Sequence, residues 1–125
     1  MYFDSFIQKT AITTLRSYDF SKGVRFYSLC NQCSSLTTIN AGIFDNTGVI
    51  DPAGFGNAFY SCALTAASIE NLLVSLDTNG QSNLELEISG GTNAAKSTWT
   101  SAATTAYAVS YTHLRAHETK ANLVC

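Results

Sequence analysis

Charged residues are scarce in this sequence. Asp, Glu, Lys and Arg make up 13% of its 125 residues, whereas ordinary soluble domains contain roughly 25%. The seven Lys and Arg residues form no cluster that could follow a phosphate backbone, so we expect no nucleic-acid partner. No apolar run approaches the ~20 residues that a helix needs to cross a bilayer, so we also expect no membrane insertion.

Histidine is equally scarce, because His113 and His117 are the only two and both stand near the end of the chain. The residues before them lack the usual general base for a serine nucleophile. On a helix, the two histidines would share a face, as zinc ligands do in helical metalloprotease motifs, although Leu114 holds the place of the Glu that the motif requires. The alternative is a solvated helix face. We expect no enzyme activity and no catalytic residue.

The stretch that carries both histidines also resembles something other than a protein motif. Residue by residue, Val109–Thr119 is similar to the translation of a transposase-type sequencing adapter, and Asn122–Cys125 fits the constant segment that resumes after an adapter index. We therefore interpret residues 109–125 as an artefactual tail and exclude them from the fold prediction. The remaining residues are enough for one modest hydrophobic core.

The cysteines suggest no metal site. Cys30 and Cys33 have the spacing of half a zinc site, but a structural site needs a second pair, and only Cys62 remains outside the tail. Cys33 and Cys62 fall at equivalent positions of an internal repeat, so stacking of the repeats could bring them to disulfide distance. The alternative is that they are small buried hydrophobic residues. We expect no bound metal and no cofactor.

An internal repeat organises the first half of the chain. Three stretches share a Phe, an apolar residue four positions later, a Thr or Cys three positions after that, and a closing Ile or Leu with Thr; they begin at Phe3, Phe26 and Phe55. The repeat length is close to that of leucine-rich-repeat units, ~20–29 residues. This spacing predicts an α/β fold in which residues 1–64 form a short leucine-rich-repeat-like solenoid of about three repeats, with the phenylalanines stacked in a ladder.

The segments between the repeats are rich in turn-forming residues. Tyr18–Val24 and Phe44–Gly54 contain most of the Asp, Asn, Gly and Pro residues of this half of the chain. We expect them to be loops on the rim of the solenoid.

Residues 65–108 change to the pattern of ordinary helices and strands. Ile69, Leu72, Leu73 and Leu76 have helical spacing after a capping Thr65 or Ser68, and Gly80 ends the helix. Alternation from Leu84 to Ile88 predicts a half-buried strand, and Gly90 and Gly91 predict a turn. A second helix is expected from about Ser97, with an apolar stripe of Trp99, Ala102, Ala103 and Ala106. This helix-strand-helix unit is predicted to be a truncated C-terminal cap.

Two features of this cap invite a functional interpretation. Glu85 and Glu87 share one face of the predicted strand, and a solvated face explains them better than a paired-carboxylate site. Trp99 and the tyrosines could stack against a sugar. Because Trp99 lies on the apolar stripe of its predicted helix, we expect it to pack in the core instead.

Three phrases of the sequence resemble a known family. Residues 33–39 (CSSLTTI), 58–80 (AFYSCALTAASIENLLVSLDTNG) and 89–107 (SGGTNAAKSTWTSAATTAY) are similar to the C-terminal end of BspA-type leucine-rich-repeat proteins from marine phage and bacterial metagenomes. The resemblance covers residues 12–107. It implies a non-catalytic surface module for recognition or adhesion, on a virion or a cell surface, with a host protein or glycan and neighbouring repeats as partners. The alternative is a purely structural cap that binds no ligand.

Overall fold

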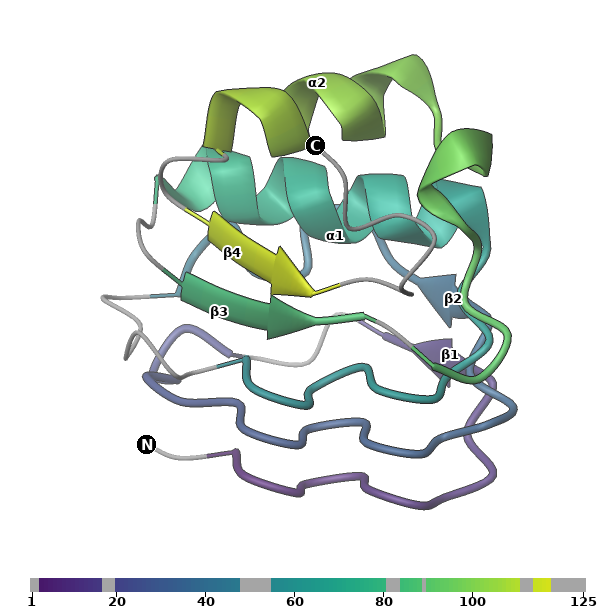
Figure 1. The fold of residues 1–125 in the computed structure, drawn as a ribbon. Helices are drawn as coiled ribbons and strands as arrows, with labels where there is room; N and C mark the ends of the chain where they lie inside the picture. The colour runs from purple at the N-terminus through teal and green to yellow at the C-terminus, as the bar shows by residue number, and fades with distance from the viewer. Residues whose placement is uncertain are drawn as a thin grey trace.

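The computed structural model describes residues 3–16, 20–47, 55–80, 84–88, 90–110 and 114–117. Their elements follow in the order β1 (Thr14–Leu15), β2 (Thr38–Ile39), α1 (Ala66–Asn79), β3 (Leu84–Glu87), a 3-10 turn (Lys96–Thr98), α2 (Ser101–Ser110) and β4 (Leu114–His117). The two helices lie together over one side of the N-terminal half (Figure 1).

The strands form two separate two-stranded parallel sheets. In the first, Thr14 of β1 faces Thr38 of β2, and Leu15 faces Ile39. In the second, β3 pairs with β4 from Leu84 opposite Leu114 to Glu87 opposite His117. An isolated parallel bridge joins Phe55 to Leu86. The second sheet therefore continues from the third of the repeated stretches.

Residues 3–10, 26–33 and 55–62, called the turn segments below, are each built from two consecutive four-residue turns. In the second segment, Leu29 N donates to Phe26 O (3.0 Å) and Cys33 N donates to Cys30 O (3.1 Å). The third residue of every turn has a positive φ of 55–59°, as type II turns require. These residues are Ser5, Lys9, Ser28, Gln32, Asn57 and Ser61.

The three turn segments lie one above another and are joined by main-chain hydrogen bonds. Ile7 N donates to Leu29 O (3.0 Å), and Cys30 N donates in turn to Ala58 O (2.7 Å). Figure 1 shows the segments as three parallel zigzags, running from purple to teal. The ring centroids of Phe3 and Phe26 are 5.5 Å apart, and those of Phe26 and Phe55 are 5.1 Å apart. The expectation that the three phenylalanines stack is confirmed.

The predicted leucine-rich-repeat-like solenoid of about three repeats is nevertheless wrong. The described residues form two unconnected two-stranded sheets and two helices, rather than a strand and a return in each of several units. The apolar spacing that suggested such units arises from paired turns, whose positive φ values prevent an extended chain. After the third of the repeated stretches, the chain enters α1 directly following Thr65.

The predicted loops are also not simply rim loops. Residues 17–19 and 48–54 lie outside the described part of the chain, but Phe20 is 3% exposed and Phe44 is fully buried. Their rings lie 5.4 Å apart and both contact Phe26. These segments therefore supply core aromatics that extend the phenylalanine ladder sideways.

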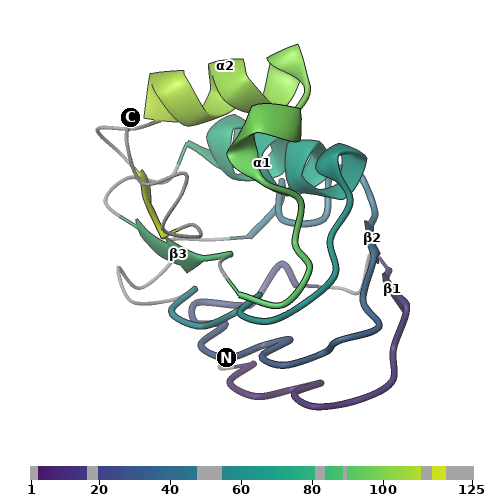
Figure 2. The same cartoon turned by 45° about the vertical axis from the view of Figure 1, so that its right-hand side comes forward.

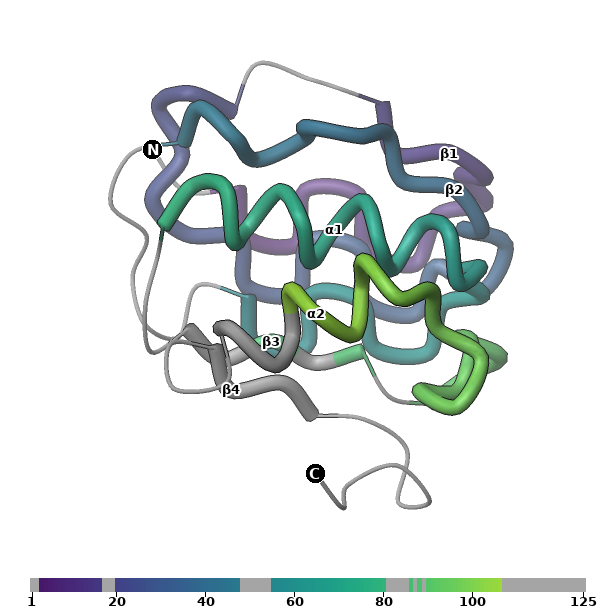
Figure 3. Tube along the Cα trace, turned by 90° about the horizontal axis from the view of Figure 1, so that it is seen from above, coloured from purple at the N-terminus to yellow at the C-terminus, as the bar shows by residue number. Residues whose placement is uncertain are grey.

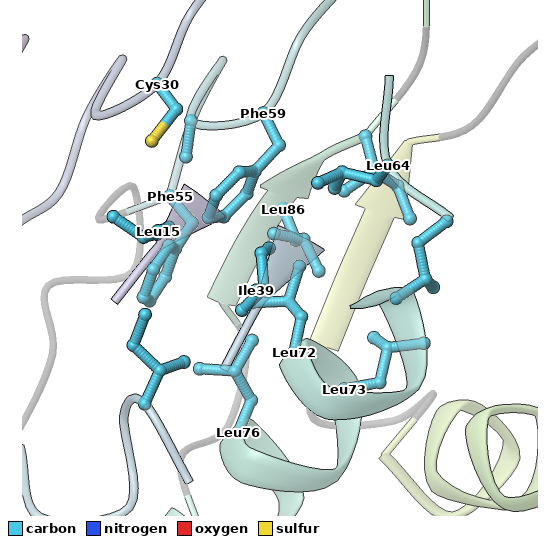
Figure 4. Close-up of a cluster of buried hydrophobic side chains, with 14 of the residues drawn as sticks. Leu15, Cys30, Ile39, Phe55, Phe59, Leu64, Leu72, Leu73, Leu76 and Leu86 are labelled. Carbon is cyan, nitrogen blue, oxygen red and sulfur yellow. The ribbon is translucent and has the colours of Figure 1, made fainter. Parts of the chain in front are cut away.

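Helix α1 forms as the sequence predicted. Thr65 is its N-cap and accepts a hydrogen bond from Ser68 N, and Gly80 ends it in the left-handed region at φ 78°. The predicted stripe of Ile69, Leu72, Leu73 and Leu76 is buried. Figure 4 shows Leu72 and Leu76 projecting from α1 towards the side chains of Ile39 and Phe55. Burial of each such side chain contributes roughly 1.5–3 kcal/mol.

A second, polar stripe on α1 attaches the helix to the chain that follows β2. Ser68, Asn71, Ser75 and Asn79 stand three or four residues apart, and each hydrogen-bonds within residues 37–47. Asn71 Nδ2, for example, donates to Ile39 O (2.7 Å), and Ser75 Oγ accepts from Phe44 N (2.8 Å). Figure 3 shows α1 running alongside this segment. Side chains of the helix thus satisfy main-chain groups that a neighbouring strand would otherwise pair.

Of the other elements predicted after α1, the strand, the turn and the second helix are present, although the solenoid that they were predicted to cap is not. The strand is present as β3, and the turn at Gly90 and Gly91 has positive φ at both residues. A Cβ atom on Gly91 would stand 2.4 Å from Cys62 O, so this close approach requires glycine. The second helix begins at Ser101 rather than near Ser97, because Thr100 Oγ1 accepts from Ala103 N and so caps it.

Helix α2 packs on α1, as Figure 2 shows from the side. Of the predicted apolar stripe, Ala103 and Ala106 are buried, whereas Ala102 is exposed. The late start of the helix explains why Ala102 is exposed. Trp99 lies before α2 in an extended conformation, so the buried side of the helix is not aligned with Trp99 as the sequence predicted.

The left-handed turn positions provide a test of the fold. Replacing Gln32, an exposed residue at φ 59°, by Gly should raise the free energy of unfolding by about 0.5–1 kcal/mol, because a side chain at positive φ costs more than the added chain entropy of Gly. Urea denaturation measures the change. The matched control Ser35→Gly, at an exposed residue without positive φ, should lower stability. Equal effects of both changes would contradict the turn assignment.

The polar stripe on α1 provides a second test of the fold. Ser75→Ala should lower the free energy of unfolding by about 1–3 kcal/mol, because it leaves the buried Phe44 N–H without an acceptor. Thermal denaturation measures the change. The control is Ser101→Ala, at an exposed serine of α2, and its free energy of unfolding should change by no more than about 0.5 kcal/mol. A Ser75→Ala variant as stable as the control would show that α1 is held by its apolar face alone.

Candidate recognition surface

Among the residues that the structure describes, those considered for catalysis or metal binding do not come together. His117 lies in β4 rather than on a helix, so the helical histidine pair is not formed, and His113 lies outside the described residues. Glu85 and Glu87 belong to β3. Among the described residues, no group of three or more His, Cys, Asp or Glu side chains is placed to hold a metal ion. No helix in this part of the chain is long and apolar enough to cross a membrane.

The tail interpreted as adapter read-through is partly included in these elements. Val109 and Ser110 end α2, and residues 114–117 form β4. The other residues of the tail lie outside the described part of the chain. Its origin as a translated adapter stays a prediction.

Trp99 packs as expected. It is 8% exposed, and its indole Nε1 donates to Ala94 O (3.1 Å). A sugar therefore cannot stack on this ring without displacing core contacts.

Cys30 and Cys33 of the second turn segment and Cys62 of the third are buried and not cross-linked. Cys62 Sγ donates to Cys30 O (3.1 Å), and Cys33 Sγ lies 2.9 Å from Ile7 O. Of the two alternatives, the structure therefore has buried thiols and no disulfide between Cys33 and Cys62. Burial raises the pKa of Cys62 to about 12.

Cys30 and Cys33 titrate as a pair. A hydrogen bond between the thiols lowers the pKa of Cys33 to about 6 and raises the pKa of Cys30, which burial raises further. A paired dithiol of this spacing is typical of redox proteins. However, both side chains are 0% exposed, and this decides against a reactive site because a reagent cannot reach either sulfur without opening of the core.

The outer face of the turn segments is the most distinctive surface of the described residues. Tyr27 and Tyr60 follow the buried Phe26 and Phe59 and are 43% and 38% exposed. Each occupies the second position of its turn, where the side chain points away from the core. We call the surface around these two rings the turn face.

Two neighbouring side chains contact Tyr27, one at its ring hydroxyl and one at its main-chain N–H. Asn57 Nδ2 of the third segment donates to Tyr27 Oη (3.3 Å), and Asp4 Oδ1 of the first segment accepts from Tyr27 N (3.2 Å). Arg25 pairs with the same Asp4 carboxylate. The two charges thus compensate each other beside Tyr27, whose hydroxyl is held by the third segment and whose main chain is held by the first.

Tyr60 lies in the other column of turns. Gln8 and Asn31 occupy the equivalent position in the first and second segments, and Asn31 Nδ2 donates to Gln8 Oε1 (3.3 Å). A Cβ atom on Gly90 would come within 3.0 Å of the Tyr60 ring, so the turn at Gly90 supports that ring from the side. The turn face therefore combines two exposed aromatic rings with amide side chains and little net charge.

The sequence suggested sugar stacking by the tyrosines as a group, but it did not single out Tyr27 or Tyr60. A signal was present, because each tyrosine directly follows a phenylalanine that begins a turn. No protein-family model matches the chain, and neither a curated protein nor a solved structure is significantly similar to it.

The Cys62 pKa gives a pH-dependent prediction. Because its folded-state pKa of about 12 exceeds the unfolded value of ~8.5, its contribution to stability is complete below pH ~8.5 and is lost as the pH rises towards 12. Unfolding free energies measured between pH 8 and 11 should therefore fall by up to ~1.4 kcal/mol per pH unit more in the wild type than in Cys62→Ala. Parallel pH profiles would contradict the prediction.

Proposed function

We propose that the chain is a non-catalytic recognition module that binds a protein or glycan at a virion or cell surface through the turn face. The observation that supports this most is the exposure of Tyr27 and Tyr60 beside hydrogen-bonding amides. Aromatic residues with a polar group are enriched at binding surfaces, because the ring buries area while the hydroxyl keeps a partner.

The rigidity of the turn face supports the same proposal. The Tyr27 ring already accepts a hydrogen bond from Asn57 at its hydroxyl, so it loses less side-chain entropy when a ligand covers it. The Asp4 carboxylate is compensated by Arg25, which favours an uncharged or weakly charged partner over a polyanion. The absence of histidine before residue 113 supports a module without acid-base chemistry.

Binding to bacterial cells tests the proposal. Fluorescently labelled wild-type chain should bind cells in flow cytometry, and the double variant Tyr27→Ala/Tyr60→Ala should lose at least tenfold in affinity, because it removes both exposed rings. Val74→Ala is the control, since Val74 is as exposed as Tyr60 but belongs to α1. Cells treated with protease or periodate separate a protein partner from a glycan.

The same measurement addresses the structural alternative. If the chain is a cap without a ligand, wild type and double variant bind cells equally weakly, and the only effect of substitutions is on stability. Circular dichroism of all three proteins establishes that a loss of binding is not a loss of folding.

A further inference from the structure

The first turn segment has an edge that the other two segments do not expose. Phe6 is 52% exposed, whereas Leu29 and Ala58, at the equivalent positions of the second and third segments, are fully buried. Phe3 and Ile7 are likewise only partly buried, although their counterparts in the next segment are 0% exposed. The pattern that closes the core elsewhere is therefore left open on one side.

Main-chain groups are open on the same edge. Ser28 N and Gln32 N of the second segment donate to Gly56 O (2.8 Å) and Tyr60 O (2.7 Å) of the third. The carbonyls of Asp4 and Gln8 hold the corresponding positions in the first segment, and they accept no hydrogen bond from any residue that the structure describes. The edge thus presents acceptors at a four-residue interval beside half-buried apolar side chains.

The interior of the molecule shows what fits such an edge. The second segment covers the third by donating from the third position of each turn, while its Phe, Leu and Cys side chains complete the apolar layer. A polypeptide with the same pattern of turns would offer N–H groups to Asp4 and Gln8 and bury Phe6. Main-chain pairing at an open edge is a recurring mode of peptide recognition.

A second copy of the chain does not provide this complement. Its second segment is covered by the first and the third, and its third segment is covered by the second and by Leu86, Gly90 and Gly91. Its own open edge offers carbonyl groups, whereas Asp4 and Gln8 need N–H donors. We therefore propose that the open edge of residues 3–10 is a docking site for a segment of a partner polypeptide that adopts the turn pattern of residues 26–33. This site adjoins the turn face, with which it shares Asp4 and Gln8, but it does not rest on binding by Tyr27 or Tyr60.

A synthetic peptide with the sequence of residues 24–40 is the probe. Titrated under reducing conditions into the isotopically labelled full chain, it should produce saturable NMR shifts at Asp4, Phe6, Ile7 and Gln8. A peptide N-methylated at its Ser28 and Gln32 positions keeps every side chain but loses both donors, and it should bind at least tenfold more weakly. A scrambled peptide should not bind.

Variants of the chain make the test specific. Phe6→Ser removes the exposed ring and should weaken peptide binding at least tenfold, while Val74→Ala on the exposed side of α1 should leave it unchanged. Ile7→Ser is a second edge variant in case Phe6→Ser unfolds, which thermal denaturation reveals. The proposal is overturned if the peptide does not bind at millimolar concentration, or if N-methylation has no effect. It is also overturned if sedimentation shows that the chain self-associates through this edge and the peptide does not compete.

Discussion

Stacked main-chain hydrogen bonds between the turn segments are the constraint on which the rest of the structure depends. Each segment must hold two residues at positive φ so that its N–H groups reach the segment above. That conformation is unfavourable for Ser, Lys and Gln, and it is stabilised only collectively, by the bonds and by the aligned rings of Phe3, Phe26 and Phe55. Removing one segment would leave the next with open carbonyls and an exposed ring.

Helix α1 pairs with main-chain groups that the stack leaves open beyond β2. Residues 37–47 continue past β2 and would expose main-chain groups, and α1 supplies side-chain partners for them at helical spacing. Asn93 likewise satisfies main-chain groups, in the segment before α1, since its amide accepts from Leu64 N and donates to Phe59 O. The buried polar residues of this chain therefore act mainly as substitutes for strand pairing.

The sequence predicted those features that local rules control. Helix α1 could be placed because a capping Thr65, an apolar stripe and a terminal Gly80 all agree, and the alignment of the phenylalanines followed from their equivalent positions. The paired turns could not be predicted, because the residues at positive φ are mostly ones that rarely adopt it, and only the contacts with neighbouring segments select that conformation. The solenoid prediction failed for this reason.

The turn face shows the same division between local and long-range information. Its tyrosines were visible in the sequence, but their exposure depends on which way each turn points, and this is fixed by the stack.

The three buried thiols also have a consequence for how the protein matures. Since Cys30, Cys33 and Cys62 are not cross-linked to one another, the packing of the turn segments does not depend on a disulfide among them, and a reducing agent should leave that packing intact.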